Sequence, residues 1–295
     1  MALEQLRSHV GLEPAPALAP ADSVRCGWLA ELELELAAAG DRTFVAHKRH
    51  AGPLCLQKPF YPGDGFCHIY VLHPPGGLAG GDSLELTLRV GEGAKALVTT
   101  PASTKFYRSL GQPSRLNNRI HVASGSALEW LPSEAILFGG SLAETSTRIE
   151  LETGASFVGW EATALGRPLS GDHFRTGRFE QRLEIRVDGS PLLLERLAGA
   201  ALDTALDAAW GWSTRRVVAS LLAYPADTQL LAAVRERLAS DRNAFFGATL
   251  IDGLFVLRAL GRDVQSVRRL LESSWAAIRP VLLDAPAISP RIWKT

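Results

Sequence analysis

Four carboxylates of this chain stand inside strongly apolar stretches, where acidic side chains are unusual. They are Asp82 after a glycine-rich turn, Glu129 before Trp130, Glu161 after Trp160, and Glu195 after three leucines. An isolated buried carboxylate is very costly, so any that point inward need a partner or a water molecule. A wet internal channel would supply that water, and its carboxylate oxygens would bind and release a divalent cation more readily than thiolates do. Strand alternation could equally turn any of the four outward to solvent.

Cys67 and His68 are a second pair of candidate metal ligands, with Cys55 and His73 close by in the sequence. Adjacent residues of a strand point to opposite faces, so Cys67 and His68 cannot easily chelate one ion. We therefore expect at most a weak, transient nickel or zinc site there. The alternative is a buried thiol beside a histidine whose ring is satisfied by a backbone carbonyl.

The segment His73-Pro-Pro-Gly-Gly-Leu-Ala-Gly-Gly-Asp82 joins two prolines to four glycines. Backbone N–H groups of a glycine-rich turn can cradle phosphate, so an enzyme that binds a phosphorylated substrate at Gly76–Gly81 is one hypothesis. The turn lacks the G-x-x-x-x-G-K-[ST] order, and the charge of Asp82 would repel an anion. We favour a tight backbone crossing that excludes Cβ atoms. The sequence also has no G-x-S-x-G nucleophile motif, so we do not expect a serine hydrolase.

The composition limits the classes of partner and compartment. Lys and Arg total 31 and Asp and Glu total 31, so the formal net charge is zero. Nucleic-acid binding normally needs a basic surplus, so we expect no nucleic-acid partner. No stretch approaches the ~18 apolar residues of a membrane span, so we expect no membrane partner either. The three cysteines, Cys26, Cys55 and Cys67, are an odd number without a CxxC motif, which favours a reducing, cytoplasmic location.

Alternating apolar and polar residues predict strands along most of the chain, as in Leu32–Leu36 and Leu84–Val90. One unit occurs three times: a strand, a turn with Gly and a small residue, and a more apolar strand. Its turn glycines are Gly93, Gly125 and Gly154, roughly thirty residues apart. The spacing predicts a layered, β-solenoid-like body of stacked hairpins. Three unrelated hairpins in a sandwich are the alternative.

The pattern changes after about residue 200. Helical spacing predicts helices over Asp227–Leu238 and Asp263–Ile278, the second stopped by Pro280, with paired strands over Gly247–Leu257 between them. The apolar tail Pro290–Thr295 should dock on the body. We predict one integrated, mainly β domain with two helices. It comprises a loose leader over 1–24, a layered β body over 25–200, and a C-terminal α/β part over 201–295.

Many short blocks of the sequence together resemble the UreD (also called UreH) family of urease accessory proteins. The resemblance covers roughly residues 27 to 295. The blocks that carry it are Gly52-Pro-Leu54, Gln57-Lys-Pro-Phe-Tyr-Pro62, Cys67-His68, His73-Pro-Pro-Gly-Gly77, Gly80-Gly-Asp82, Thr99-Thr-Pro101, Lys105-Phe-Tyr-Arg108, Leu128-Glu-Trp-Leu-Pro132, Leu165-Gly-Arg167, Leu194-Glu-Arg196 and Pro290-Arg-Ile-Trp293. Two departures are Gly63-Asp64, where family members commonly have Glu, and Asp172, where Glu is usual.

The resemblance implies a non-enzymatic factor for urease maturation. Family members bind apo-urease and the helical protein UreF, which recruits the GTPase UreG, and together they help to place two nickel ions in urease. The resemblance implies a β-rich solenoid-like stack with a water-filled internal passage, and no cofactor beyond transient Ni²⁺. Asp82, Glu161 and Glu195 would line that passage, with Thr104 and Lys105 nearby. The alternative within the same family is an adaptor that only binds its partners and conducts no metal.

Overall fold

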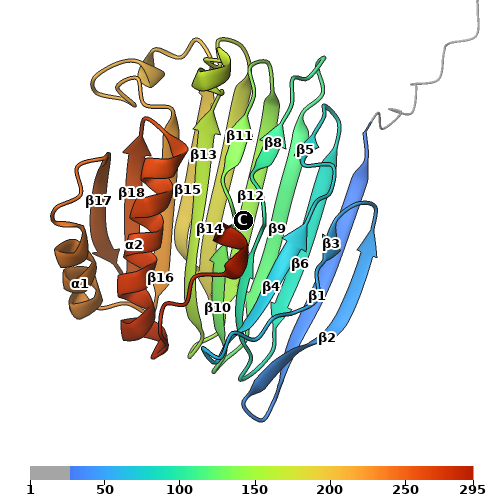
Figure 1. Ribbon diagram of the computed structural model, residues 1–295, viewed down its shortest axis with the longest axis vertical. Helices are drawn as coiled ribbons and strands as arrows, with labels where there is room; N and C mark the ends of the chain where they lie inside the picture. The colour runs from blue at the N-terminus through green and yellow to red at the C-terminus, as the bar shows by residue number, and fades with distance from the viewer. Residues whose placement is uncertain (1–26, 295) are drawn as a thin grey trace, which may run out of the picture.

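Two β-sheets lie face to face, and the chain passes repeatedly from one to the other (Figure 1). The computed structural model describes residues 27–294, so the predicted leader over 1–24 and Cys26 lie outside the described residues. The seven-stranded sheet has the order β15 (Ser190–Ala200), β14 (Arg178–Val187), β12 (Leu142–Leu151), β9 (Ser114–Val122), β6 (Ser83–Val90), β1 (Leu29–Ala39), β2 (Arg42–Ala51).

The second sheet has eleven strands and forms the other layer. Its main path is β17 (Ala244–Ile251), β18 (Leu254–Gly261), β16 (Val217–Tyr224), β13 (Ser156–Leu165), β10 (Ala127–Leu131), β7 (Lys95–Thr99), β4 (Cys67–Leu72), β3 (Cys55–Leu56). Three short strands complete it beside β13: β11 (Ala135–Leu137), β8 (Thr104–Phe106) and β5 (Gly77–Leu78). Short 3₁₀ turns lie at η1 (Pro168–Ser170), η2 (Thr204–Leu206) and η3 (Arg291–Lys294).

The threefold unit of the sequence builds this layered body, which confirms the solenoid-like prediction. Strands β6, β9 and β12 lie side by side in parallel in one sheet, and the strands that follow them, β7, β10 and β13, do so in the other. Gly93, Gly125 and Gly154 adopt positive φ angles of 71°, 67° and 87° at the turns between the layers. The two strands of a unit pair with their counterparts in the next layer, not with each other. The units are therefore arches, and the predicted hairpins are wrong at this point.

Antiparallel strands close the body on the side of its C-terminal half. Asp188 and Gly189 have φ angles of 47° and 76° and form the predicted tight turn between β14 and β15. Strands β17 and β18 form the second predicted pair, and β16 joins them to β13.

Two helices cover the outer face of the larger sheet (Figure 1). Helix α1 (Thr228–Leu238) begins after Asp227 and α2 (Val264–Leu283) after Asp263, and each aspartate side chain accepts a backbone N–H of its helix. The predicted stop at Pro280 is wrong, because α2 continues to Leu283. Pro280 removes one backbone donor, but the side chain of the adjacent Arg279 anchors this last turn by donating to Glu129 of β10 and to Asp64.

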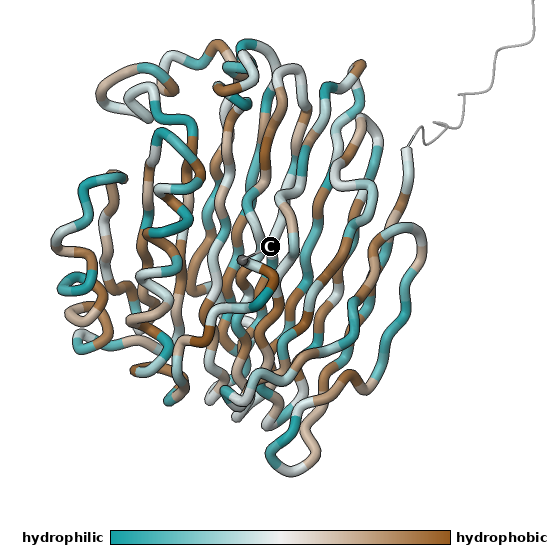
Figure 2. The backbone as a smooth tube through the Cα atoms, in the orientation of Figure 1, coloured by the Kyte–Doolittle hydropathy of each residue, from teal (hydrophilic) through white to brown (hydrophobic). Residues whose placement is uncertain are grey.

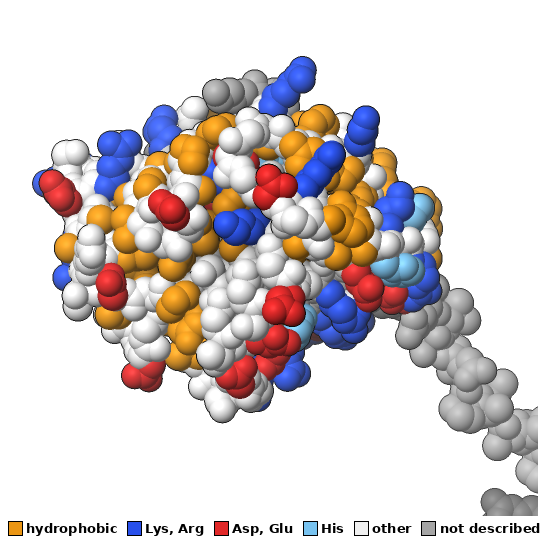
Figure 3. All heavy atoms as spheres, turned by 90° about the horizontal axis from the view of Figure 1, so that it is seen from below, with side chains coloured by type: hydrophobic (Ala, Val, Ile, Leu, Met, Phe, Trp, Pro, Cys, Tyr) orange, Lys and Arg blue, Asp and Glu red, His pale blue; other side chains and the backbone are white. Residues whose placement is uncertain are grey.

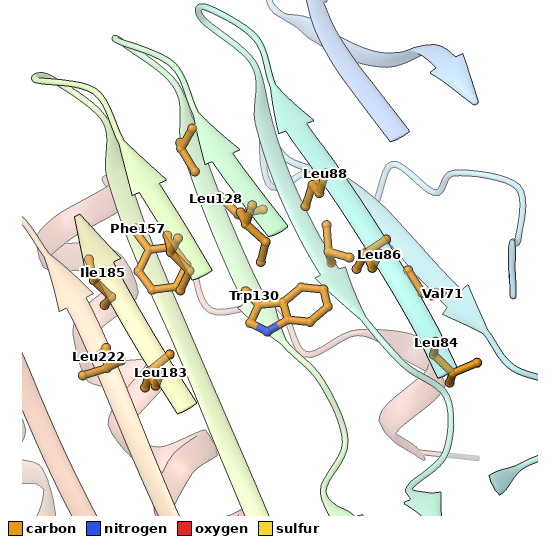
Figure 4. Close-up of a cluster of buried hydrophobic side chains, with 14 of the residues drawn as sticks. Val71, Leu84, Leu86, Leu88, Leu128, Trp130, Phe157, Leu183, Ile185 and Leu222 are labelled. Atoms are coloured by element: carbon orange, nitrogen blue, oxygen red, sulfur yellow. The ribbon is translucent and has the colours of Figure 1, made fainter. Parts of the chain in front are cut away.

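Apolar side chains fill two separate layers. One lies between the sheets and includes Leu86, Trp130 and Phe157 (Figure 4), and the other lies between the larger sheet and the helices. The alternation of hydrophobic and hydrophilic residues along the outer strands is visible in Figure 2. The tail docks as predicted, since Trp293 packs on Trp160 and Trp275 and donates to the Thr99 hydroxyl at 3.0 Å.

The face seen from below in Figure 3 mixes acidic, basic and apolar side chains without a broad basic area. No helix of the described residues is long and apolar enough to cross a bilayer.

Candidate functional site

A series of three neighbouring cavities runs through the space between the two sheets. The middle cavity, of about 120 Å³, shares Glu161 and Gln181 with a cavity of about 380 Å³ at the open edge of the sandwich. It shares His73 and Leu84 with a third cavity of about 280 Å³. The predicted carboxylates are distributed along the series: Glu195 lines the first cavity, Glu161 the first two, and Asp82 the third.

Glu161 stands at the junction of the first two cavities. Strand alternation turns Trp160 toward the helices and Glu161 toward the inter-sheet space. Gln181 on β14 donates to the Glu161 carboxylate at 2.6 Å, and Thr163 donates to the Gln181 carbonyl at 3.1 Å. Asn118 donates to the Thr147 hydroxyl at 3.0 Å, which extends this polar row across the seven-stranded sheet.

Burial raises the pKa of Glu161, and the nearby Glu195 charge adds to that effect, although hydrogen bonds from Thr147 and Gln181 oppose it. The side chain is therefore held partly toward its neutral form inside the protein. A cation that binds to it must compete with a proton.

Glu195 bridges the two sheets at the open edge. Its carboxylate accepts from the Arg258 Nη2 of β18 at 2.7 Å, and both side chains remain partly exposed. An ion pair of this kind is weak because water screens it.

Asp82 is bound to backbone at the far end of the series. Its two carboxylate oxygens accept the N–H groups of Trp28 at 2.8 Å and Ala79 at 2.7 Å. Asp82 therefore closes the glycine-rich turn and has less freedom to bind a cation than Glu161 or Glu195.

The same turn shows how its glycines are used. A Cβ on Gly77 would lie 2.6 Å from the Tyr107 ring, and one on Gly80 would lie 2.4 Å from the Ser109 hydroxyl. The N–H groups of Gly76 and Gly81 are bonded to the carbonyls of His73 and Pro113. This geometry supports the tight crossing that we favoured over a phosphate cradle.

The middle cavity carries polar groups from several strands. Thr104 lines it as expected, and Lys105 lies nearby, with its amino group 4.0 Å from where a Cβ on Gly76 would be. Trp130 lines the cavity, and its indole Nε1 is buried without a protein hydrogen-bond partner. A buried donor beside a cavity is the position where an internal water is expected.

Glu129 faces the opposite way and takes part in a buried ion cluster that the sequence did not predict. Its carboxylate accepts from the Trp275 indole at 2.6 Å and from Arg279 Nε at 3.0 Å. Arg279 also donates to Asp64 at 2.9 Å, and Asp64 contacts the His68 ring at 2.8 Å. The available signal was Arg279 itself, a charged residue on the apolar stripe of α2.

The two carboxylates of this cluster respond differently to burial. Burial raises the pKa of Glu129 despite the opposing Arg279 charge and the Trp275 hydrogen bond. Burial alone would also raise the pKa of Asp64, but His68, the Phe66 N–H and Arg279 outweigh it and lower that pKa. The Asp64 carboxylate, in the Gly63-Asp64 pair singled out above, is thus held by the Phe66 N–H, the His68 ring and Arg279.

Cys67 and His68 point to opposite sides of β4, as the alternation required. Cys67 packs in the inter-sheet core, where burial raises the pKa of its thiol, and His68 is held by Asp64. A carboxylate, not the expected carbonyl, satisfies His68. Asp172, the other departure, accepts the N–H groups of Gly139 and Phe174 and so orders a turn.

Within residues 27–294, no three His, Cys, Asp or Glu side chains come together as a metal-holding group. The site therefore consists of separated carboxylates along neighbouring cavities that share lining residues, a geometry that suits brief contacts better than tight chelation.

The sequence comparisons point in one direction. The model of the family described as "UreD urease accessory protein" matches residues 29–294. The chain is 45% identical to a urease accessory protein UreD of Alkalilimnicola ehrlichii over the full length of both chains. It is 42% identical to UreD of Pseudomonas putida strain W619 over 91% of this chain and 95% of that one. It is 40% identical to a protein named UreD 2 of Brucella anthropi over 91% of this chain and 99% of that one.

Proposed function

The chain belongs to the UreD family of urease accessory proteins, and we propose that it is a scaffold through which Ni²⁺ reaches apo-urease. In this proposal it binds apo-urease and UreF in the cytoplasm, and UreF brings UreG to the complex. Its relatives are named accessory proteins, which favours a non-catalytic role in urease maturation. Nickel is cargo here, and the protein holds no tightly bound cofactor.

The observation that carries the conducting part of the proposal is the position of Glu161 at the junction of two cavities. A cation that passed between them would meet this carboxylate inside the protein. On one side of Glu161 it would meet Glu195, at the open edge. On the other side it would meet Asp82, at the far end of the series. The path has carboxylate oxygens at several points, and within residues 27–294 no cluster of ligands would hold the ion tightly.

The chemistry of Glu161 suits transit. Its raised pKa means that Ni²⁺ competes with a proton for this carboxylate, and the ionised carboxylate is stabilised by the cation. Gln181 already donates to the same carboxylate, so the side chain has a neutral partner when the ion leaves. Separated, hydrated oxygen ligands keep each stop weak, which a conduit requires.

The experiment is nickel loading of urease that has been co-produced with the accessory proteins. Glu161→Ala, Glu195→Ala and the double variant should assemble with apo-urease and UreF as the wild type does, but leave urease with less bound nickel. Glu144→Ala is the matched control, because Glu144 lies on the exposed outer face of β12, paired with Arg115. We expect it to behave as the wild type in both measurements.

Two outcomes would redirect the proposal. Full nickel loading by the double variant would leave an adaptor that binds its partners while metal travels elsewhere. If the wild-type protein assembles with neither apo-urease nor UreF, the proposed role in maturation is itself wrong.

A further inference from the structure

The larger sheet extends one strand beyond the smaller one at the open edge of the sandwich. Strand β15 ends the seven-stranded sheet, and its Glu195 lies opposite Arg258 of β18. Strand β17 continues past this point, as Figure 1 shows, with no strand of the other sheet facing it. Its uncovered inner residues alternate, as a strand face requires: Phe245, Gly247, Thr249 and Ile251. Phe245 is 63% exposed.

Part of the backbone of β15 is free on this side. The N–H of Ala201 bonds to the carbonyl of Gly177, the residue before β14, so the odd-numbered residues of this part of β15 face β14. The backbone groups of Ala198 and Ala200 therefore point away from β14, although the Ala200 carbonyl already accepts the Asp203 N–H at 2.9 Å. The stretch from Leu197 to Ala200 carries no charge and no proline, the usual devices that protect an edge.

The other long edges also carry protective features, whereas on β15 Pro191, Glu195 and Arg196 leave the stretch from Leu197 to Ala200 without one. On β17, Arg235 donates to the Ala248 carbonyl at 2.7 Å. On β2, charged and ionisable side chains follow one another from His47 to His50. These are the features by which proteins discourage added strands.

We propose that β15 accepts an extended segment of a partner protein as an eighth strand of the smaller sheet. The inference rests on the proposed function, which requires this chain to bind other proteins. The segment would fill the position opposite β17, cover Phe245, and close the mouth of the cavity of about 380 Å³.

The geometry defines the chemistry of that segment. Its inward side chains alternate and are apolar, since they meet Phe245 and the apolar wall formed by Leu197 and Trp212. One of them is a carboxylate, because Arg215 stacks on the Phe245 ring at 3.7 Å and forms no salt bridge among the described residues, whereas Arg258 is already paired with Glu195.

A second copy of this chain does not fit the same edge. If two copies were joined edge to edge through β15, the β17 of each copy would lie opposite the β15 of the other copy. That position is already filled by the other copy's own β18. The overhang leaves room for one added strand and not for a second sandwich. This separates the proposed partner from a homodimer.

The test is amide hydrogen exchange of the full chain, free and bound to UreF or to apo-urease, each complex prepared separately. In one of the two complexes, the amides of Ala198 and Ala200 should exchange at least tenfold more slowly than in the free chain. If both complexes form and these amides exchange at the free rate in each, the added strand is refuted while the proposed function stands. If neither complex forms, the proposed function fails, and the added strand fails with it.

A matched pair of variants makes the same test by affinity. Ala198→Pro removes an outward N–H without removing a bond to β14, whereas Ala198→Val keeps that N–H. We expect Ala198→Pro to weaken binding at least tenfold and Ala198→Val to bind as the wild type. Equal binding by a folded Ala198→Pro would overturn the inference, and if this variant does not fold, the exchange measurement on the wild type decides.

Discussion

Two glutamates beside tryptophans show how residue order decides what a buried carboxylate can do. In Glu129-Trp130 the glutamate comes first, and in Trp160-Glu161 it comes second. Strands β10 and β13 are neighbours in one sheet, and Glu129 pairs in register with Val158. The reversed order therefore sends Glu129 toward α2 and Glu161 toward the cavities between the sheets.

The two environments treat a carboxylate in opposite ways. Glu129 is fully buried and held by Arg279 and Trp275, so it ties α2 to the sheet. Glu161 has only neutral donors and lines two cavities. An ion cluster of the first kind is fixed because every group depends on the others. A carboxylate of the second kind is free to exchange its proton for a cation.

The largest expected effect is at the fixed cluster. Arg279→Met would leave Glu129 and Asp64 buried without their common cation, and we expect a loss of about 3–5 kcal/mol in the free energy of unfolding. Denaturant unfolding measures it. Arg148→Met is the control, since Arg148 is exposed on β12, and it should change stability by less than about 0.5 kcal/mol. A loss at position 279 as small as that of the control would show that the cluster does not anchor α2.

A matched pair of tryptophan variants separates the two regions more finely. Trp275→Phe removes a hydrogen bond to a buried carboxylate, which costs about 1.5–3 kcal/mol beyond the lost ring area. Trp130→Phe removes a donor that has no protein partner and faces the cavity, so it should cost at least about 1 kcal/mol less than Trp275→Phe. Equal losses in denaturant unfolding would contradict the distinction.

The smallest effect is the pH dependence of Glu161→Gln. Because the folded-state pKa of Glu161 is raised, its contribution to stability is full below the unfolded pKa of about 4.3 and is lost as pH rises through the folded pKa. The variant cannot ionise, so its stability relative to the wild type should increase across that window and then level off. Unfolding curves at a series of pH values measure the difference.

Glu180→Gln is the control of opposite sign. Hydrogen bonds from Arg196 and Arg182 lower the pKa of Glu180 to about 2. The wild type should therefore exceed this variant in stability above about pH 4.3, and the difference should disappear as pH falls toward 2. A difference between Glu161→Gln and the wild type that did not change with pH would show that Glu161 has no raised pKa.

Local patterns in the sequence predicted much of the fold. Alternation identified the strands, Asp227 and Asp263 marked the helix starts, and Asp188-Gly189 marked a tight turn. The pairing of the arches escaped prediction, because a strand pattern does not say whether its partner is the next strand or one a layer away. The helix end escaped because Arg279, whose contacts hold the last turn, joins residues as distant as Asp64.

The candidate site was predictable only in part. Apolar neighbours singled out Glu129 and Glu161 alike, since they can be recognised in the sequence itself. Glu129, and not Glu161, is paired with the Arg279 side chain. That pairing depends on the packing of α2, which lies far away along the sequence. The inward direction of Glu161 and the arrangement of the cavities follow from packing between two sheets, which no single segment encodes.

The most direct test of the internal path is the nickel content of urease matured with a blocked protein. Ser220 lies opposite Glu161 across β13 and β16 and lines the cavity of about 380 Å³, so Ser220→Phe would fill the junction. Ser146→Phe makes the same substitution on β12, where Thr145 and Thr147 face the middle cavity and Ser146 faces away from it. With equal assembly of both variants, we predict urease depleted of nickel for Ser220→Phe and normally loaded for Ser146→Phe. Full loading in both would contradict a nickel path through this interior.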